Sequence, residues 1–199
     1  MTPEIRRFLP DDEPALYDIC LRTGDSGEDA TALHTDPALI GHVYVGPYLS
    51  LAPDLAFVAE DEDGVAGYVL GARDTRVFEH ECERDWWPEL RERYPRTAFP
   101  SSSRDGGLVR LLHEPAVAAD DVLERYPAHL HIDLLPRLQG RGYGRRLMET
   151  LFAALRAARV PGVHLGVGLA NERATAFYRH LGFTEAHRDP HSLVLGRHL

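Results

Sequence analysis

The chain has 199 residues, of which 44% are hydrophobic and 27% are charged. These proportions are ordinary for a soluble globular protein, and the length favours one domain over residues 1–199. A formal net charge of −9 disfavours nucleic-acid binding, which needs a concentrated basic face. We expect neither a membrane-spanning helix nor a signal peptide, because no apolar run is long enough for the first and the N-terminus lacks the apolar stretch of the second.

Taken in chain order, the first half predicts strands at residues 5–8, 55–60 and 65–72. The last two are joined by a hairpin turn that ends in Gly64. A helix begins near Pro14, where acidic residues and proline are typical of a first turn, and presents Leu16, Ile19 and Cys20 on one face. Further helices are expected at residues 37–48 and 77–93, loops at 23–29 and 95–105, a short segment at 108–112 and a turn at 120–124.

The second half predicts a strand over residues 129–135, a glycine-rich turn, and a helix whose apolar positions are Leu147, Met148, Leu151, Phe152 and Leu155. A strand at residues 163–169 follows. The next helix has Asn171 as its N-cap and Gly182 just beyond its end. Residues 192–195 form the last expected strand.

The glycine-rich turn, Gln139-Gly-Arg-Gly-Tyr-Gly144, is the strongest chemical signal. Backbone N–H groups at a helix N-terminus are unpaired, and the helix dipole favours an anion there. Glycines at positions 140, 142 and 144 let a diphosphate approach the backbone, and Arg141 and Arg145 can add charge-assisted contacts. The turn predicts a pyrophosphate-bearing ligand, although a ligand-free helix entry is an open alternative.

The spacing argues against two common nucleotide motifs. A dinucleotide fingerprint needs Gly-x-Gly-x-x-Gly after the first strand, and a Walker A turn needs a lysine, which this chain lacks. The pattern Gln139-x-x-Gly142-x-Gly144 resembles the acetyl-coenzyme A turn of the GNAT N-acetyltransferase superfamily. About 30 residues later, Asn171-x-x-Ala174-x-x-Phe177-Tyr178-x-x-x-Gly182-Phe183 resembles the second signature of that family.

The resemblance implies a GNAT fold, of the α/β (α+β) class, with a mixed central β-sheet flanked by helices. A helical insert at about residues 74–127 would precede the central strand and could shape or cover the acceptor side. Further segments, among them Gly67-Tyr68-x-Leu-Gly71 and Leu195-Gly-Arg-x-Leu199, resemble the C-terminal acetyltransferase-like domain of eukaryotic O-GlcNAcase. The chain looks like a stand-alone bacterial relative of that domain, and O-GlcNAc cleavage is not implied.

The family implies that acetyl-coenzyme A is the co-substrate and that an amine attacks it directly. Leu134 and Leu135 would bind the pantetheine arm through their backbone and help to stabilise the oxyanion. The turn from Gln139 to Arg145, with Tyr143 among its residues, would hold the diphosphate. Asn171 and Ala174 would contact the cofactor, and Tyr178 would act as general acid toward the leaving thiolate. Asn171 as a plain helix cap and Tyr178 as a core residue are the alternatives.

The general base is less defined. His129, His131 and Asp133 alternate with apolar residues, so they share one strand face and need partners or a function. Asp133, which matches an aspartate of the O-GlcNAcase-like domain, could accept the amine proton, anchor a cationic acceptor, or make a structural hydrogen bond. No metal site is expected. The two cysteines, Cys20 and Cys82, lack Cys-x-x-Cys spacing, which fits a reducing cytoplasm.

Two functions stay open, an N-acetyltransferase and a non-catalytic acyl-coenzyme A-binding module. The acceptor, whether small amine, peptide or protein, is undetermined, and a homodimer is an option. Neither nucleic acid nor membrane is an expected partner. Trp86 and Trp87 could line the acceptor side, although a core position is favoured, and the loop around Asp25 is more simply a solvated loop.

Overall fold

The computed structural model describes residues 4–190 and 192–199, and in this part of the chain seven strands form one mixed sheet. The N-terminal segment, for which no signal peptide is expected, begins with three residues that lie outside the described part of the chain. The strand order is β1–β2–β3–β4–β5–β7–β6, and every neighbouring pair is antiparallel except the parallel pair β4–β5. The strands are β1 Glu4–Arg7, β2 Ala56–Asp61, β3 Gly64–Ala72, β4 Ala128–Leu134, β5 Gly162–Gly168, β6 Thr184–Arg188 and β7 Ser192–His198.

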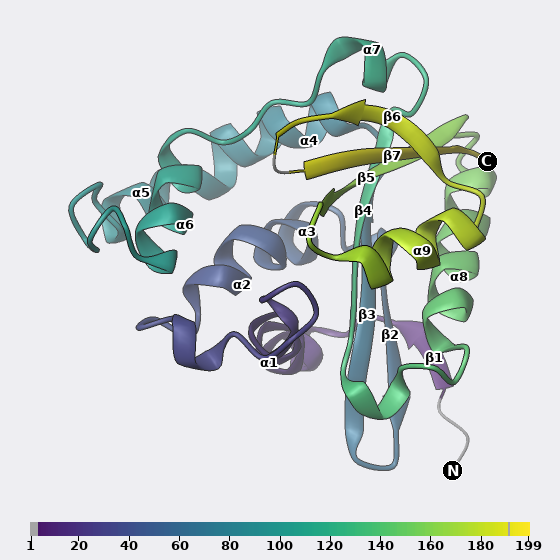
Figure 1. Cartoon of the computed structure of the whole chain (residues 1–199), viewed down its shortest axis with the longest axis horizontal. Coiled ribbons are helices and arrows are strands. Elements are labelled where there is room, and N and C mark those ends of the chain that lie inside the picture. The colour runs from purple at the N-terminus through teal and green to yellow at the C-terminus, as the bar shows by residue number, and fades with distance from the viewer. Residues whose placement is uncertain (1–3, 191) are drawn as a thin grey trace.

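Helices cover both faces of the sheet, which lies between α8 and the pair α1 and α2 (Figure 1). The helices are α1 Glu13–Thr23, α2 Leu39–Tyr44, α3 Gly46–Leu51, α4 Thr75–Glu81, α5 Trp87–Arg93, α6 Arg104–His113, α7 Asp120–Leu123, α8 Tyr143–Ala157 and α9 Glu172–His180. Alternation along β3 separates the two faces: a Cβ at Gly71 would meet Leu151 of α8, whereas Tyr68 points toward Cys20 of α1. The expected mixed sheet flanked by helices is confirmed.

The apolar face predicted for α8 is the centre of the core. Leu147, Met148, Leu151 and Leu155 are fully buried and Phe152 is 1% exposed. Burying one such side chain stabilises a fold by about 1.5–3 kcal/mol. The helix therefore anchors the glycine turn at its own N-terminus to the interior of the sheet.

Two expected helices are irregular next to a proline. Residues 37–48 form α2 and α3 with a kink at Val45, since Pro47 has no N–H to donate to the preceding turn. Residues 77–93 belong to α4 and α5, which a π-helical turn, Cys82–Trp86, joins next to Pro88. The helical character of both segments is confirmed. Residues 77–93 are helical throughout, with a π-helical turn in the middle, whereas residues 37–48 are interrupted at Val45.

One helix is longer than predicted, and one strand was not predicted. The short segment at 108–112 is part of α6, which begins inside the expected loop because the Ser103 side chain accepts a hydrogen bond from the Gly106 N–H and caps the helix. Strand β6 was missed entirely. Its side chains are almost all exposed, so it lacks the alternation that marks a half-buried strand.

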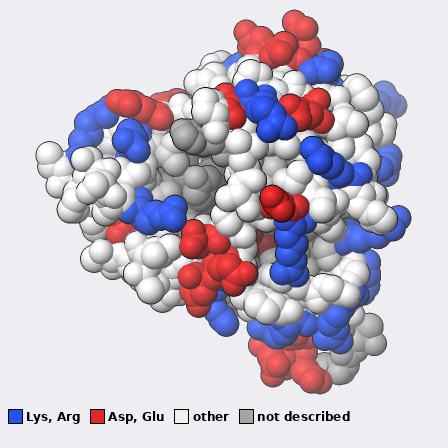
Figure 2. Space-filling model, in the orientation of Figure 1, with Lys and Arg blue, Asp and Glu red and all other residues white. Residues whose placement is uncertain are grey.

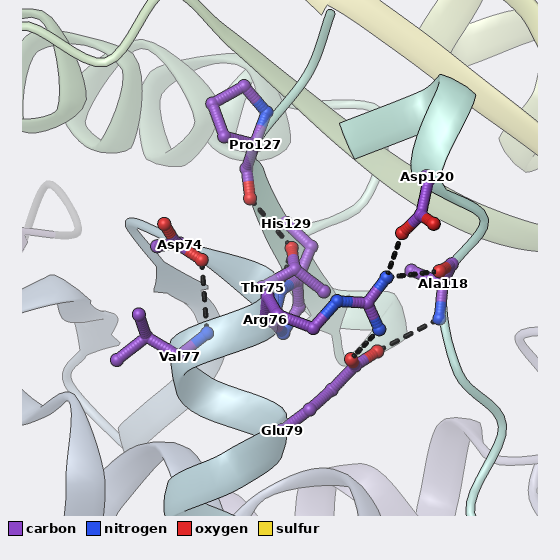
Figure 3. A network of polar contacts seen from close by, with 9 residues as sticks. All are labelled: Asp74, Thr75, Arg76, Val77, Glu79, Ala118, Asp120, Pro127 and His129. Atoms are coloured by element: carbon purple, nitrogen blue, oxygen red, sulfur yellow. Dashed lines mark hydrogen bonds and ion pairs between the residues drawn. The ribbon is translucent and has the colours of Figure 1, made fainter. Parts of the chain in front are cut away.

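A polar network holds the predicted insert against the start of β4 (Figure 3). Arg76 contacts Glu79, the Ala118 carbonyl and Asp120 at 2.6–2.9 Å. In the same network the Thr75 hydroxyl lies 2.8 Å from the Pro127 carbonyl and 2.8 Å from His129 Nδ1. The insert is thereby tied to the central strand, while α6 packs on α2 and α5. Within the described segments, no helix has the length and apolar character needed to cross a membrane.

Candidate active site

A cleft opens in the middle of the sheet because β4 and β5 separate. They pair only at Ala128–Val163 and His129–His164, after which β5 continues along β7 and β4 along β3. Beyond that point no strand of the described residues pairs with the β5 side of β4. The end of β4 therefore diverges from β5.

The cleft has a volume of about 1070 Å³. It is lined by the end of β4, the glycine turn, the start of α9, the loop after α1, and α2. Ten of the predicted site residues line it, namely Asp133, Leu134, Gln139, Gly140, Gly142, Gly144, Arg145, Asn171, Ala174 and Tyr178. Leu135, Arg141 and Tyr143 do not.

The glycine turn leads directly into α8. Gly140 and Gly142 have φ angles of +69° and +83°, which L-residues rarely adopt, and a Cβ at either position would meet no atom within 4 Å. Gly144 has a different role, because a Cβ there would lie 3.2 Å from Cζ of Phe177 in α9. The first two glycines leave the helix N-terminus open to the cleft, and the third lets α9 pack close to it.

Of the two arginines predicted to contact the diphosphate, only Arg145 lines the cleft. Arg145 lines the cleft and pairs with Glu149 at 2.7 Å. The Arg141 guanidinium turns away, donates to the Arg137 carbonyl at 3.2 Å, and lies over the Tyr143 ring. Arg173, at the start of α9, lines the cleft and was not predicted. Figure 2 shows arginines over α8 and α9 and acidic side chains over the loop after α1.

The backbone N–H and C=O groups of Leu134 and Leu135 point in opposite directions. The Leu135 N–H donates to the Ala66 carbonyl at 2.8 Å, and its side chain is only 3% exposed, so the predicted pantetheine contact does not hold for it. Backbone groups alternate along a strand, so those of Leu134 point to the cleft edge. The Gln139 side chain donates to the Leu134 carbonyl at 2.8 Å, which fixes the turn to the strand.

The Tyr143 side chain does not line the cleft. Its ring is 6% exposed, with the guanidinium of Arg146 5.0 Å above it, so only its backbone at the first helical turn remains available to a ligand.

Asn171 caps α9 as predicted. Its Oδ1 accepts a hydrogen bond from the Ala174 N–H at 3.0 Å. Because the carbonyl oxygen is used by the cap, the side-chain NH₂ group is left for a ligand in the cleft. The cap and a binding role are compatible.

Tyr178 projects from α9 and is 9% exposed. Its ring packs against Phe177 and Phe183, and its hydroxyl makes no hydrogen bond within residues 4–190 and 192–199. Burial, and then the charge of Asp133, raises the pKa of this phenol. The group stays protonated at neutral pH and can donate a proton or a hydrogen bond.

Asp133 lies at the end of β4 in the cleft wall. Burial raises the pKa of its carboxyl to about 6, although the hydrogen bond from Tyr68 opposes the shift. The Tyr68 phenol donates to Oδ2 at 2.5 Å. A carboxylate with a pKa near neutrality suits a general base.

The two histidines of the same strand face have different surroundings. His129 is held by Thr75 and does not line the cleft, so it is structural. His131 lines the cleft beside Tyr44 and Tyr48, and burial lowers its pKa to about 4. In the described part of the chain no three His, Cys, Asp or Glu residues are arranged to hold a metal ion.

The acceptor side is built from α1 and α2. Gly24, Ser26, Gly27 and Glu28 line it from the loop after α1, and Tyr44 lines it from α2. Asp25 instead pairs with Arg104 at 3.1 Å. No residue of the fully described segment 74–127 lines the cleft, so the insert supports α2 rather than covering the acceptor side.

Trp87 is a core residue, 8% exposed, as favoured. Trp86 donates from Nε1 to the His42 carbonyl at 3.0 Å and likewise lies outside the cleft.

The family model described as "Acetyltransferase (GNAT) family" matches residues 27–183, which is most of the chain. The chain belongs to the GNAT acetyltransferase family. Protein O-GlcNAcase of Rattus norvegicus and that of Mus musculus are each 31% identical to it over 183 residues, 91% of this chain and 20% of theirs. The expected likeness to O-GlcNAcase is confirmed, and the chain spans about a fifth of the length of these curated relatives.

Solved structures agree with the family. SsHAT is 44% identical, with a TM-score of 0.93 over 100% of this chain and 98% of that one. The PaiA N-acetyltransferase of Thermoplasma acidophilum in complex with coenzyme A, 13% identical with a TM-score of 0.61 over 100% of both chains, shares the fold. GNAT acetyltransferases use acetyl-coenzyme A.

Sequence reasoning missed Tyr68, Glu28, Tyr44 and Arg173. Only Tyr68 carried a usable signal, a tyrosine in the middle of an apolar strand, where a buried hydroxyl needs a partner. The others line the cleft only because distant elements meet there.

Proposed function

We propose that this GNAT protein is an acetyl-coenzyme A-dependent N-acetyltransferase that transfers the acetyl group directly to an amine. The observation that carries the proposal is the cleft between β4 and β5, because it joins three separate parts of the chemistry. It holds a helix N-terminus with an open glycine turn, a carboxyl with a raised pKa, and a protonated phenol.

The turn and the two helix starts supply the binding site for the co-substrate. Unpaired N–H groups of the first turn of α8, with Arg145 and Arg173 beside them, suit the diphosphate. We assign binding of the pantetheine arm to the NH₂ group of Asn171 and the backbone N–H of Leu134. An N–H aimed at the thioester oxygen would stabilise the oxyanion by about 3–4 kcal/mol.

The reaction needs two proton movements. Asp133 takes a proton from the ammonium form of the acceptor, and the free amine attacks the thioester carbon. As the C–N bond forms and the C–S bond breaks, Tyr178 donates a proton to the sulfur. The nitrogen then loses a second proton, and this proton restores the hydroxyl of Tyr178. Asp133 is favoured over His131 as the base because its pKa of about 6 is closer to neutrality than about 4.

A thiol-release assay with acetyl-coenzyme A and a panel of amines, peptides and basic proteins tests the proposal. We expect acceptor-dependent release of free coenzyme A, with mass spectrometry showing one acetyl group added to the acceptor. Saturable acetyl-coenzyme A binding without transfer to any acceptor would instead support a non-catalytic acyl-coenzyme A-binding module.

A further inference from the structure

Tyr68 and Asp133 form a directly paired couple across two strands. They are register partners in the antiparallel pair β3–β4, and the Tyr68 phenol donates to Oδ2 of Asp133 at 2.5 Å. Tyr68 is fully buried, whereas Asp133 lines the cleft. Tyr68 therefore does not contact the cleft itself, and it can affect a ligand there only through its hydrogen bond to the Asp133 carboxyl group.

The tyrosine has little freedom to move. It lies in the third strand of the sheet and belongs to the largest side chains with no exposed surface. Burial, and then the charge of Asp133, keeps its pKa well above the usual range. The phenol therefore remains a hydrogen-bond donor throughout the pH range in which Asp133 titrates.

Few other polar groups face Asp133. Thr23 and Cys20 approach from α1, Tyr178 from α9, and His131 lies two residues back on the same strand face. The Thr23 hydroxyl uses its proton in a 2.8 Å bond to the Ile19 carbonyl. Among the described residues no arginine contributes to the pKa of Asp133, so the phenol is its strongest partner.

We propose that Tyr68 is a positioning residue for acetyl transfer, which holds Oδ2 of Asp133 and leaves Oδ1 as the oxygen that accepts the amine proton. This rests on the proposed function. The proton passes from the acceptor nitrogen to Oδ1, and Tyr68 keeps its own proton throughout. A held carboxylate cannot rotate, which fixes the direction of the base. The same bond favours the charged form and so sets the pH at which the base becomes available.

The decisive variant is Tyr68→Phe, followed by ¹³C NMR titration of carboxyl-labelled aspartate, with Asp133→Asn used to assign the Asp133 signal. No acceptor is required. Loss of a hydrogen bond to a charged group should raise the Asp133 midpoint by about one to two pH units. In the transfer assay the rise of kcat with pH should move upward by the same amount. The KM for acetyl-coenzyme A should change less than twofold.

The structure offers a matched control. Tyr94 donates to Oδ2 of Asp36 at 2.8 Å and is 5% exposed, so Tyr94→Phe removes the same kind of bond outside the cleft. It should lower the melting temperature without moving the Asp133 midpoint or the pH profile. In an Asp133→Asn background, Tyr68→Phe should cause no further loss of transfer.

A second variant covers the case in which Tyr68→Phe does not fold. Site-specific 3-fluorotyrosine at position 68 keeps the ring and hydroxyl and makes the phenol a stronger donor, so the midpoint should move downward. An unchanged midpoint in the folded variants overturns the proposal whatever the activity. A shifted midpoint in a protein that transfers acetyl to no acceptor overturns the proposed function, and the role of Tyr68 in the reaction with it.

Discussion

At the scale of single residues, the burial of Asp133 raises its pKa into the range of a general base and lowers the stability of the folded protein at neutral pH. Its carboxyl has a pKa of about 6 in the folded protein, against an ordinary value of 3.8. Between these two pH values the folded state binds the proton more strongly than the unfolded state does. Stability is therefore unaffected by this group below pH 3.8, falls as the pH rises toward 6, and stays reduced above it.

Asp133→Asn should accordingly have opposite effects on activity and stability. Transfer should fall by about 10²–10⁴-fold. The free energy of unfolding at pH 8 should rise by up to about 3 kcal/mol, because the neutral amide removes a buried charge. Circular dichroism melts at pH 4 and pH 8 measure the second effect, which should be present only at the higher pH. Asp36→Asn, at the Tyr94 pair, should gain no stability. Normal transfer with unchanged melting would remove Asp133 from both roles.

Tyr178 is the second residue whose surroundings suit proton transfer. Tyr178→Phe removes only the hydroxyl, and the ring contacts with Phe177 and Phe183 remain. Turnover should fall by about 10²–10⁴-fold while affinity for acetyl-coenzyme A changes little. Steady-state kinetics and calorimetry separate the two quantities. Tyr126→Phe, a phenol that is 4% exposed and lies outside the cleft, is the control. Equal turnover in both variants would make Tyr178 a packing residue.

At the scale of elements, the N-terminus of α9 combines a cap with a ligand contact. Asn171→Asp keeps an oxygen for the Ala174 N–H but loses the NH₂ donor. We expect near-normal stability and an affinity for acetyl-coenzyme A that is weaker by about three- to tenfold. Asn171→Ala should lose the cap as well, at about 1 kcal/mol. Calorimetry and thermal melts on both variants check this, and normal binding by Asn171→Asp would leave Asn171 as a cap alone.

The turn before α8 depends on the absence of a side chain at Gly142. Gly142→Val imposes left-handed strain of about 1–2 kcal/mol or more and places a branched side chain in the cleft. Gly64, with φ +97° and open space around it in the β2–β3 hairpin, supplies the matched control. Gly64→Val should lose similar stability but bind acetyl-coenzyme A normally, whereas Gly142→Val should not bind it. Fluorescence binding titrations test this, and normal binding by Gly142→Val would move the diphosphate elsewhere.

At the scale of the whole molecule, the sheet is two units joined by a short seam. Strands β1–β4 and β5–β7 meet only at two parallel residue pairs, and the cleft occupies the space beyond them. A ligand that lies along β4, α8 and α9 contacts both units. Its binding should therefore couple their stability.

Acetyl-coenzyme A at 100 times its dissociation constant should stabilise the fold by about 2.7 kcal/mol. For a chain of this size that corresponds to a rise in melting temperature of about 5–10 °C. Scanning calorimetry with acetyl-coenzyme A, and with adenosine alone as the control, measures it. No shift at millimolar acetyl-coenzyme A would contradict the assignment of the cleft.

The sequence by itself determined the local features of this protein. These features are the glycine turn, the Asn171 cap and the apolar face of α8. Each depends on the types and spacing of residues within a short segment, which can be read from the sequence. Their order along the chain was enough to indicate the family. Even so, β6 was not predicted, because an exposed edge strand shows no alternation. Pro47 interrupts a helix whose periodicity looked continuous, and a π-helical turn lies just before Pro88.

Only the tertiary structure decided which side chains share the cleft. Tyr68 and Asp133 are 65 residues apart, and their contact depends on the β3–β4 register, which no local pattern specifies. The backbone groups of Leu134 point to the cleft and those of Leu135 point to β3. Similarly, the Arg145 side chain lines the cleft, whereas the Arg141 side chain packs over Tyr143. The raised pKa of Asp133 likewise comes from burial by elements distant in sequence, because a pKa depends on the surroundings of a group and not on its neighbours along the chain.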